Sequence, residues 1–247
     1  DWRAPVDTFD GMAAALIGTP WDYFDLAGEF LARLDALEAL GIPVLNSPQV
    51  VRWNIEKSYL RDLESRGARA IPTLWLEDAG RGDILAALDR FGTDSVVVKR
   101  QIGGGALGQH RFTRDGLPPE DWRMDHPAMI QPFLPAIVEE GEISLIFIDG
   151  KFSHGLRKLA AKGDYRIPSL FGGREEDYAP SPAELAQAAA VLAACPFPDP
   201  TYARIDMVRL PSGELAVMEA ELIEPYLYPD QGPELGERLA AAVARRL

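Results

Sequence analysis

The sequence predicts a mixed fold, in which a small parallel α/β layer is followed by α+β units. A strand–helix–strand pattern opens the chain, and two strand hairpins follow it, around residues 95–113 and 202–221. The 247 residues, 47% of them hydrophobic, are enough to bury a sizeable core. The order of the elements therefore favours an α/β start joined to α+β pieces.

Residues 1–48 are expected to form the α/β layer. A strand, a helix and a second strand are predicted at residues 12–17, 30–40 and 42–45. The helix carries apolar residues at helical spacing and ends at Gly41. Strand, helix and strand in this order favour parallel pairing. Because the chain starts without Met and reaches an apolar run at once, we expect an edge unit to be absent from the front of this layer.

Residues 49–129 are expected to form a central α+β unit, after a turn at residues 46–48. Helical spacing and β-branched runs predict helices at residues 54–66 and 82–91, and strands at residues 70–76, 95–100 and 110–113. The glycines between the last two strands predict a flexible loop over residues 103–108.

Residues 130–247 are expected to form a C-terminal α+β unit. Its predicted strands cover residues 129–134, 142–148, 151–159, 202–210 and 215–221, and its predicted helices cover residues 183–194 and 234–247. Residues 160–180 are rich in Gly, Pro and charged residues, which predicts a long loop.

Composition argues against several classes of function. The 38 acidic and 25 basic residues give a net charge of −13, which disfavours a nucleic-acid or anionic-membrane surface. No apolar run reaches the length of a membrane-spanning helix, and no cationic start precedes an apolar block. The one cysteine, Cys195, is expected to be a buried core thiol. We therefore expect a cytoplasmic protein whose partners are small molecules.

The first candidate site is a lysine that precedes a glycine loop. Lys99 ends a predicted strand, and Gly103, Gly104, Gly105 and Gly108 follow it. Glycines let backbone N–H groups approach anionic oxygens closely, and the lysine adds a compact positive charge. The pattern indicates a phosphate site, although a strand that ends in a surface turn explains these residues equally well.

The second candidate site is a group of carboxylates on the predicted hairpin of residues 202–221. Arg204 and Asp206 face the same side of one strand, and Glu219 and Glu221 share a face of the other. Three crowded carboxylates repel each other unless a cation lies among them, and Mg²⁺ prefers such hard oxygen ligands. The pattern favours a magnesium site over a solvated outer face.

The third candidate segment is Gln131–Pro135, which Glu139 and Glu142 follow. Its prolines interrupt a sheet ladder and leave backbone groups that can recognise the edge of adenine. A nearby carboxylate can hold ribose hydroxyls. By itself, however, the segment is more typical of a connection between domains.

Taken in order, these motifs resemble the ATP-grasp superfamily. Lys99 with its glycine loop comes first, then QPFLP, then GEISLIFIDGKF, and finally RID and EAELIEP. The resemblance extends from about residue 48 to residue 225, and its C-terminal half is similar to glutathione synthetase-like and D-alanine ligase-like enzymes. It implies a fold in which two α+β subdomains clasp ATP.

The resemblance implies which residues bind the nucleotide. Lys99 would touch the α- and β-phosphates of ATP. The glycine loop that would fold over the triphosphate comprises Gly103, Gly104, Gly105 and the residues up to Gly108. Adenine would be read by the run Gln131, Pro132, Phe133 and Leu134. Ribose would be bound by Glu142 or by Glu139.

The resemblance also implies a metal site. Asp206, Glu219 and Glu221 would be ligands of Mg²⁺, or of Mn²⁺, and Arg204 would steady the transferred phosphate. Members of the superfamily often have Asn at the last metal position, so Glu221 is a departure. Its extra charge is expected to be compatible with Mg²⁺ and to affect metal number or substrate preference.

A narrower resemblance involves residues 155–173 and the run Trp21-Asp22-Tyr23. Both are similar to a subgroup that includes ligases closing the D-cycloserine ring. The similarity implies that Lys158 and Arg166 hold the acyl-phosphate or the γ-phosphate. Members often carry an arginine where this chain has residues 18–20, which leaves the carboxylate substrate open, and core packing explains the two aromatic residues equally well.

We expect an ATP-dependent carboxylate–amine ligase that acts through an acyl-phosphate and releases ADP and phosphate. Three alternatives stay open: a ring-closing ligase, a small-molecule kinase that uses the same site, and a nucleotide-binding protein without turnover. The expected partners are a small carboxylate, a small amine and further copies of the chain in a dimer or tetramer.

Overall fold

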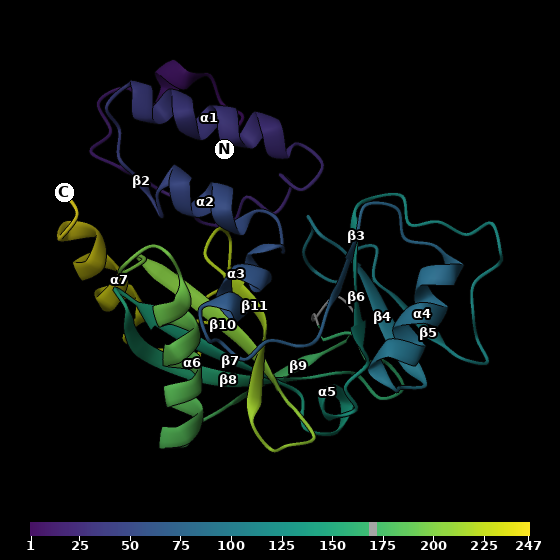
Figure 1. Ribbon diagram of the computed structural model, residues 1–247. Helices are drawn as coiled ribbons and strands as arrows, with labels where there is room; N and C mark the ends of the chain where they lie inside the picture. Colours follow the sequence, from purple (N-terminus) through teal and green to yellow (C-terminus); the bar gives the residue numbers. More distant parts are fainter. Residues whose placement is uncertain (168–171) are drawn as a thin grey trace.

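The computed structural model describes residues 1–167 and 172–247 (Figure 1). Its helices are the 3-10 helix η1 (Val6–Phe9) and α1 (Ala27–Ala39), α2 (Pro48–Asn54), α3 (Tyr59–Ser65), α4 (Arg81–Phe91), α5 (Ala136–Glu139), α6 (Pro182–Ala194) and α7 (Leu235–Ala244). Its strands are β1 (Ala15–Leu16), β2 (Val44–Leu45), β3 (Leu74–Leu76), β4 (Ser95–Arg100), β5 (His110–Thr113), β6 (Ala128–Pro132), β7 (Glu142–Ile148), β8 (Lys151–Leu159), β9 (Arg174–Asp177), β10 (Tyr202–Arg209) and β11 (Leu215–Glu221).

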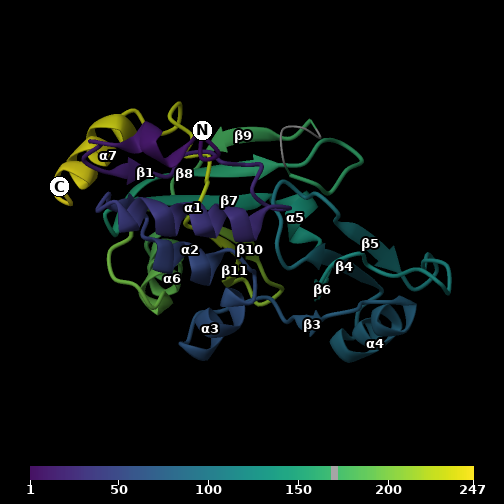
Figure 2. The same cartoon turned by 90° about the horizontal axis from the view of Figure 1, so that it is seen from above.

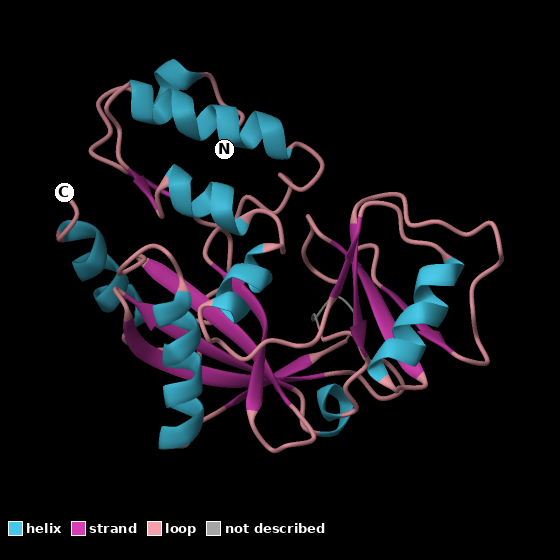
Figure 3. Cartoon of the chain, in the orientation of Figure 1, coloured by secondary structure: helices cyan, strands magenta, loops and turns pink. Residues whose placement is uncertain are grey.

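Two antiparallel sheets form the body of the molecule, and a small N-terminal layer lies beside them (Figure 3). The larger sheet has the strand order β11-β10-β7-β8-β9, and the smaller has the order β3-β6-β4-β5. Seen from above, α1 and α2 lie on the side of the larger sheet, and the smaller sheet with α4 extends away from it (Figure 2). This arrangement confirms the predicted fold class.

The N-terminal layer contains the predicted strand, helix and strand. β1 and β2 pair in parallel, with Ala15 opposite Val44. α1 buries Phe30, Leu34 and Leu37 against them. The expected six-residue first strand is shortened to the two residues of β1.

The helix predicted over residues 54–66 is in fact two helices, and the turn predicted at residues 46–48 is the start of the first. The Ser47 hydroxyl accepts a hydrogen bond from the backbone N–H of Val50 at 3.4 Å, and Pro48 occupies the first helical turn. Ser-Pro is therefore a helix cap here. The helical backbone is interrupted between α2 and α3. There the backbone N–H of Lys57 donates to the carbonyl of Gln101 at 2.8 Å.

The smaller sheet carries the glycine loop, which connects β4 to β5. β4 lies between β5 and β6, and α4 covers one face with a core that includes Ile84, Leu88 and Val98. The strand predicted over residues 70–76 is wrong in its first half. Pro72 has no N–H to donate to a ladder, so the strand begins only at Leu74. β6 crosses the expected domain boundary at residues 129 and 130.

The larger sheet contains the strands predicted at residues 142–148, 151–159, 202–210 and 215–221. β7 pairs with β8 and with β10, and β10 pairs with β11. The loop predicted over residues 160–180 is wrong at residues 174–177, because β9 adds an edge strand there and pairs with β8. Phe171, which contributed to the narrower family resemblance, lies outside the described residues.

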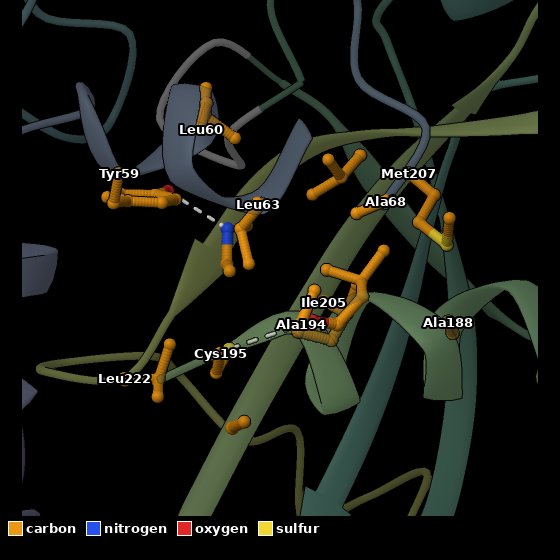
Figure 4. Close-up of a cluster of buried hydrophobic side chains, with 14 of the residues drawn as sticks. Tyr59, Leu60, Leu63, Ala68, Ala188, Ala194, Cys195, Ile205, Met207 and Leu222 are labelled. Atoms are coloured by element: carbon orange, nitrogen blue, oxygen red, sulfur yellow. Dashed lines mark hydrogen bonds between the residues drawn. The ribbon is translucent and has the colours of Figure 1, made fainter. Parts of the chain in front are cut away.

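The main core lies between the larger sheet and the helices α3 and α6 (Figure 4). Leu63 from α3 and Ile205 and Met207 from β10 are fully buried in it. Cys195, at the end of α6, is 8% exposed and lies in the same cluster, so the prediction of a buried core thiol is confirmed. Within the described residues no helix has both the length and the apolar character to cross a bilayer.

We expect Cys195 to be unreactive until the protein unfolds. Burial raises the pKa of its thiol to about 12, and only the thiolate attacks a disulfide reagent. Ellman's reagent at neutral pH should react roughly 100-fold or more slowly with the native protein than with the protein in guanidinium chloride. Cys195→Ala provides the blank. Rapid stoichiometric labelling of the native protein would contradict this packing.

Candidate active site

Four neighbouring strands of the larger sheet bring their charged residues to one place. Asp206 of β10 lies opposite Ser144 of β7, and Glu142 of β7 lies opposite Lys158 of β8. On the other side, Asp206 lies opposite Glu219 of β11. Because residues in register share a face, the antiparallel order β11-β10-β7-β8 alone gathers these side chains.

Asp206 is the centre of this cluster and is only 3% exposed. The guanidinium of Arg204 donates to its carboxylate through Nη2 at 2.9 Å and through Nε at 3.0 Å. The Ser144 hydroxyl donates to Oδ1 at 2.5 Å, and Lys158 Nζ lies 3.3 Å from Oδ2. Burial opposes ionisation, but the Arg204 and Lys158 cations hold the pKa of Asp206 well below its usual range.

Lys158 connects Asp206 to a second buried carboxylate. Its Nζ donates to Glu142 Oε1 at 2.6 Å and lies 5.6 Å from the centre of the Tyr228 ring. Lys158 thus lies in one cluster with Arg204 and Asp206. Glu142 is engaged by Lys158, whereas Glu139, the other ribose candidate, is exposed on α5.

The remaining expected metal ligands lie at the edge of this cluster. Glu221 accepts a hydrogen bond from Arg204, and Glu219 lies 3.7 Å from Lys57 Nζ. Burial raises the pKa of Glu221 to about 8, with Arg204 opposing and the charges of Asp206 and Glu219 adding to the shift. In the part of the chain that the structure describes, no three acidic, His or Cys side chains are arranged to hold a metal ion. The crowded hard oxygens nevertheless fit the chemistry of Mg²⁺.

Two lysines lie beside these carboxylates on the side of the glycine loop. Lys99 of β4 has no ion-pair partner within 4.0 Å among residues 1–167 and 172–247. Burial lowers its pKa, and the charge of Glu219 opposes the shift. Lys57 donates to the carbonyl of Gly103. Lys57 was not predicted as a site residue, because it lay inside an expected helix, where a lysine is typical of a solvated face.

The glycine loop contacts the N-terminal layer. A Cβ atom on Gly104 would lie 2.6 Å from the ring of Phe24, and Gly105 has a φ of +61°. Glycine is therefore required at Gly104 for close approach and is favoured at Gly105 by the backbone. The carbonyl oxygen of Gly103 accepts a hydrogen bond from Lys57 Nζ.

The expected adenine segment follows β6. Gln131 is buried and donates through Nε2 to Thr73 Oγ1 at 3.0 Å, and the strand ends at Pro132. The N–H of Phe133 donates to the carbonyl of Ser95 at 2.9 Å, and the guanidinium of Arg111 lies 3.6 Å above its ring. Leu134 packs with Phe133 in a small apolar cluster between the two sheets.

Arg166 lies on the segment after β8. Its Nη2 pairs with Asp164 Oδ2 at 2.7 Å, and its backbone N–H donates to the same carboxylate at 2.9 Å. These contacts are local to the segment, and they do not bring Arg166 into the described contacts of Lys158 and Asp206.

The N-terminal layer is joined to the site through Glu224, three residues after Glu221. The Tyr23 hydroxyl lies 3.0 Å and 3.1 Å from the two carboxylate oxygens of Glu224, and Trp21 Nε1 donates to its carbonyl at 2.9 Å. Glu224 was not predicted as a site residue, because one glutamate before a proline carries no distinctive spacing. Trp21 and Tyr23 thus form a contact between layers.

We expect Glu224 to make stability depend on pH. Burial raises its pKa from 4.5 to about 7, with Tyr23 and Lys57 opposing the shift. The folded state therefore binds the proton of Glu224 more tightly than the unfolded state does. The stabilisation that results is fully present below the pKa of Glu224 in the unfolded chain, and it is lost as pH rises through its pKa in the folded protein. Relative to Glu224→Gln, the wild-type protein should lose roughly 1 to 3 kcal/mol of unfolding free energy between about pH 4.5 and pH 7.5.

Urea denaturation at a series of pH values measures this difference. The exposed Glu237→Gln of α7 removes one charge elsewhere and serves as the control. Parallel stability curves for wild type and Glu224→Gln would show that Glu224 does not titrate in this way.

Comparisons with known proteins identify relatives that match this chain over its whole length. Residues 1–46 match a family model described as the N-terminal domain of D-cycloserine synthetase DcsG. The whole chain is 28% identical to the cycloserine biosynthesis protein DcsG of Streptomyces lavendulae over 264 positions, which cover 87% of that protein. A segment covering 58% of the chain is 32% identical to 46% of a glutathione synthetase from Prochlorococcus marinus (strain MIT 9313).

Solved structures show the same relationship. The crystal structure of D-cycloserine synthetase DcsG superposes with a TM-score of 0.81 at 27% identity, covering all of this chain and 88% of that one. A D-alanine–D-alanine ligase from Bacillus anthracis superposes with a TM-score of 0.68 at 21% identity, covering 97% of this chain and 81% of that one. The fold is therefore the ATP-grasp fold.

Proposed function

Because the chain is an ATP-grasp protein similar over its whole length to D-cycloserine synthetase, we propose that it is an ATP-dependent ligase that joins a carboxylate to an amine. The observation that supports this best is the buried cluster of Asp206, Arg204, Lys158 and Glu142. Such a cluster, next to two lysines and a glycine loop, suits the stabilisation of a phosphoryl group in transfer.

The nucleotide would lie between the two sheets. Lys99 and Lys57 would bind its phosphates, and the loop of Gly103, Gly104 and Gly105 would cover them. The Gln131–Leu134 run would contact adenine, and Glu139 or Glu142 would contact ribose. Lys99 supports this assignment, because it is half-buried and forms no ion pair within 4.0 Å among the described residues, which favours an anionic ligand.

Asp206, Glu219 and Glu221 would hold Mg²⁺, or Mn²⁺. The metal supplies positive charge that lowers the repulsion between the phosphates and the attacking carboxylate. The chain's own cations add to this effect. Arg204 and Lys158 would bind the oxygens of the transferred phosphoryl group and keep it in line with the attacking oxygen.

The reaction proceeds in two steps. A carboxylate oxygen of the substrate attacks the γ-phosphorus, the bond to ADP breaks, and an acyl-phosphate forms. An amine nitrogen then attacks the acyl carbon, phosphate leaves with the bonding pair, and the nitrogen loses a proton. No enzyme nucleophile is needed, and Cys195, which is buried in the core, is unavailable for such a role.

An intramolecular form of this reaction, in which the amine and the carboxylate belong to one molecule, would use the same residues. The full-length similarity to D-cycloserine synthetase is the observation that raises it, without favouring it over ligation of two substrates. A single substrate that consumes ATP and yields a cyclic product separates the two.

We expect Mg-ATP turnover that depends on a carboxylate. ADP release should be measured across a panel of amino acids, dipeptides and related acids, with hydroxylamine present to trap the acyl-phosphate as a hydroxamate. Asp206→Asn and Glu219→Gln should lower hydroxamate formation by at least about 100-fold, because each removes an expected metal ligand. Glu237→Gln should leave it unchanged. ADP release without any hydroxamate would instead indicate a kinase or simple hydrolysis.

We also expect Lys57 and Lys99 to contribute to nucleotide affinity. Lys57→Met and Lys99→Met should each raise the KM for ATP by roughly 10-fold or more, because each removes a charge beside the phosphates. Lys151→Met, on the exposed start of β8, is the matched control. An unchanged KM for ATP in both variants would place the phosphates elsewhere.

A further inference from the structure

Among the described residues, Glu224 differs from Glu142, Asp206, Glu219 and Glu221 in having no cationic group within 4 Å. Each of the others lies within 4 Å of a cation: Glu142 and Asp206 of Lys158, Asp206 and Glu221 of Arg204, and Glu219 of Lys57. Among the described residues Glu224 forms no such ion pair, and its side-chain partner is the hydroxyl of Tyr23.

One hydroxyl cannot satisfy this carboxylate. The Tyr23 hydroxyl has a single proton to donate, whereas an ionised carboxylate can accept about four hydrogen bonds. A carboxylate that is partly shielded from water and forms no ion pair is costly to ionise. The raised pKa of Glu224 agrees with that cost, since burial is its largest cause. A cation supplied from outside the chain would complete the arrangement.

The position of this carboxylate is fixed from two sides. Trp21 Nε1 holds the backbone carbonyl of Glu224, and Pro225 follows directly. Tyr23 is 3% exposed, and its ring stacks on Phe30 with a centroid distance of 4.9 Å. The carboxylate is therefore held at a preorganised junction between the N-terminal layer and the end of β11.

Glu224 also lies near the charged residues of the candidate site. It follows Glu221 by three residues, and its charge interacts with those of Lys57, Glu219 and Arg204. A ligand nitrogen held by Glu224 would thus be adjacent to the residues that are proposed to bind the phosphates and the metal.

We propose that Glu224 binds the ammonium group of the amine substrate and positions it beside the acyl-phosphate. This inference rests on the proposed ligase function. It identifies the substrate class as an aliphatic amine that is protonated in solution, such as the α-amino group of an amino acid, and that attacks after losing a proton to water. An amine that is neutral in solution would gain nothing from Glu224.

A pair of isosteric probes tests this assignment without the natural amine. Alaninamide carries an ammonium group where lactamide carries a neutral hydroxyl, and neither has a carboxylate to activate. Each is added, in both configurations, to the hydroxamate assay at pH 7 with wild type, Glu224→Gln and Tyr23→Phe. The amide oxygen introduced by Glu224→Gln would still accept from Tyr23, so this variant changes the charge and preserves the contact between layers.

Wild type should be inhibited by alaninamide at roughly 10-fold lower concentration than by lactamide, because only the ammonium group of alaninamide forms a charge-assisted hydrogen bond with the Glu224 carboxylate. In Glu224→Gln the two probes should differ by less than about twofold, with hydroxamate formation retained, since hydroxylamine is neutral. Tyr23→Phe should keep the preference, because its carboxylate remains. A purely structural Glu224 would leave the discrimination between probes unchanged.

Three results would overturn the inference. Wild type could fail to distinguish the probes, or the preference could survive in Glu224→Gln. Loss of hydroxamate in folded Glu224→Gln would assign Glu224 to phosphoryl transfer instead. If wild type itself forms no hydroxamate with any acid, the ligase function fails first, and that outcome is recognised before any variant is compared.

Discussion

The whole site depends on keeping Asp206 ionised in a place that water does not reach. A buried carboxylate needs several donors, and no single strand can supply them. Arg204 comes from the same strand, Ser144 from β7 and Lys158 from β8. The antiparallel registers of these strands are thus fixed by charge as well as by the apolar core beneath them. Removing one member would leave another charge uncompensated, so the cluster acts as a unit.

Local patterns predicted much of the fold and the part of the site that lies on one hairpin. The sequence predicted Arg204, Asp206, Glu219 and Glu221 as a group, because side chains two positions apart on a strand lie on the same face. Lys57 and Glu224 were missed because each is placed by a distant contact, with Gly103 and with Tyr23. The break between α2 and α3 was missed for the same reason, since the Lys57 N–H bonds to Gln101 in another segment.

On the proposed assignments, the groups for phosphoryl chemistry and the groups that would select the substrate lie in different parts of the molecule. The two sheets carry the groups proposed to bind nucleotide and metal, which any ligase of this kind needs. The N-terminal layer meets them at Glu224, through Tyr23 and Trp21, which come from a short loop rather than from the sheets. Changes in that loop would therefore alter which molecules are accepted while the phosphoryl chemistry stayed intact.

The packing of Phe24 on Gly104 has a consequence for the order of events. The ring belongs to the layer that would select the substrate, and the glycine belongs to the loop that would cover the phosphates. Any movement of the loop around a nucleotide must shift or reseat that ring. The two ligands would then change each other's affinity by the same factor, because such coupling is reciprocal. An empty nucleotide site would leave the substrate pocket incompletely formed, which would restrict ATP consumption to encounters in which both ligands are bound.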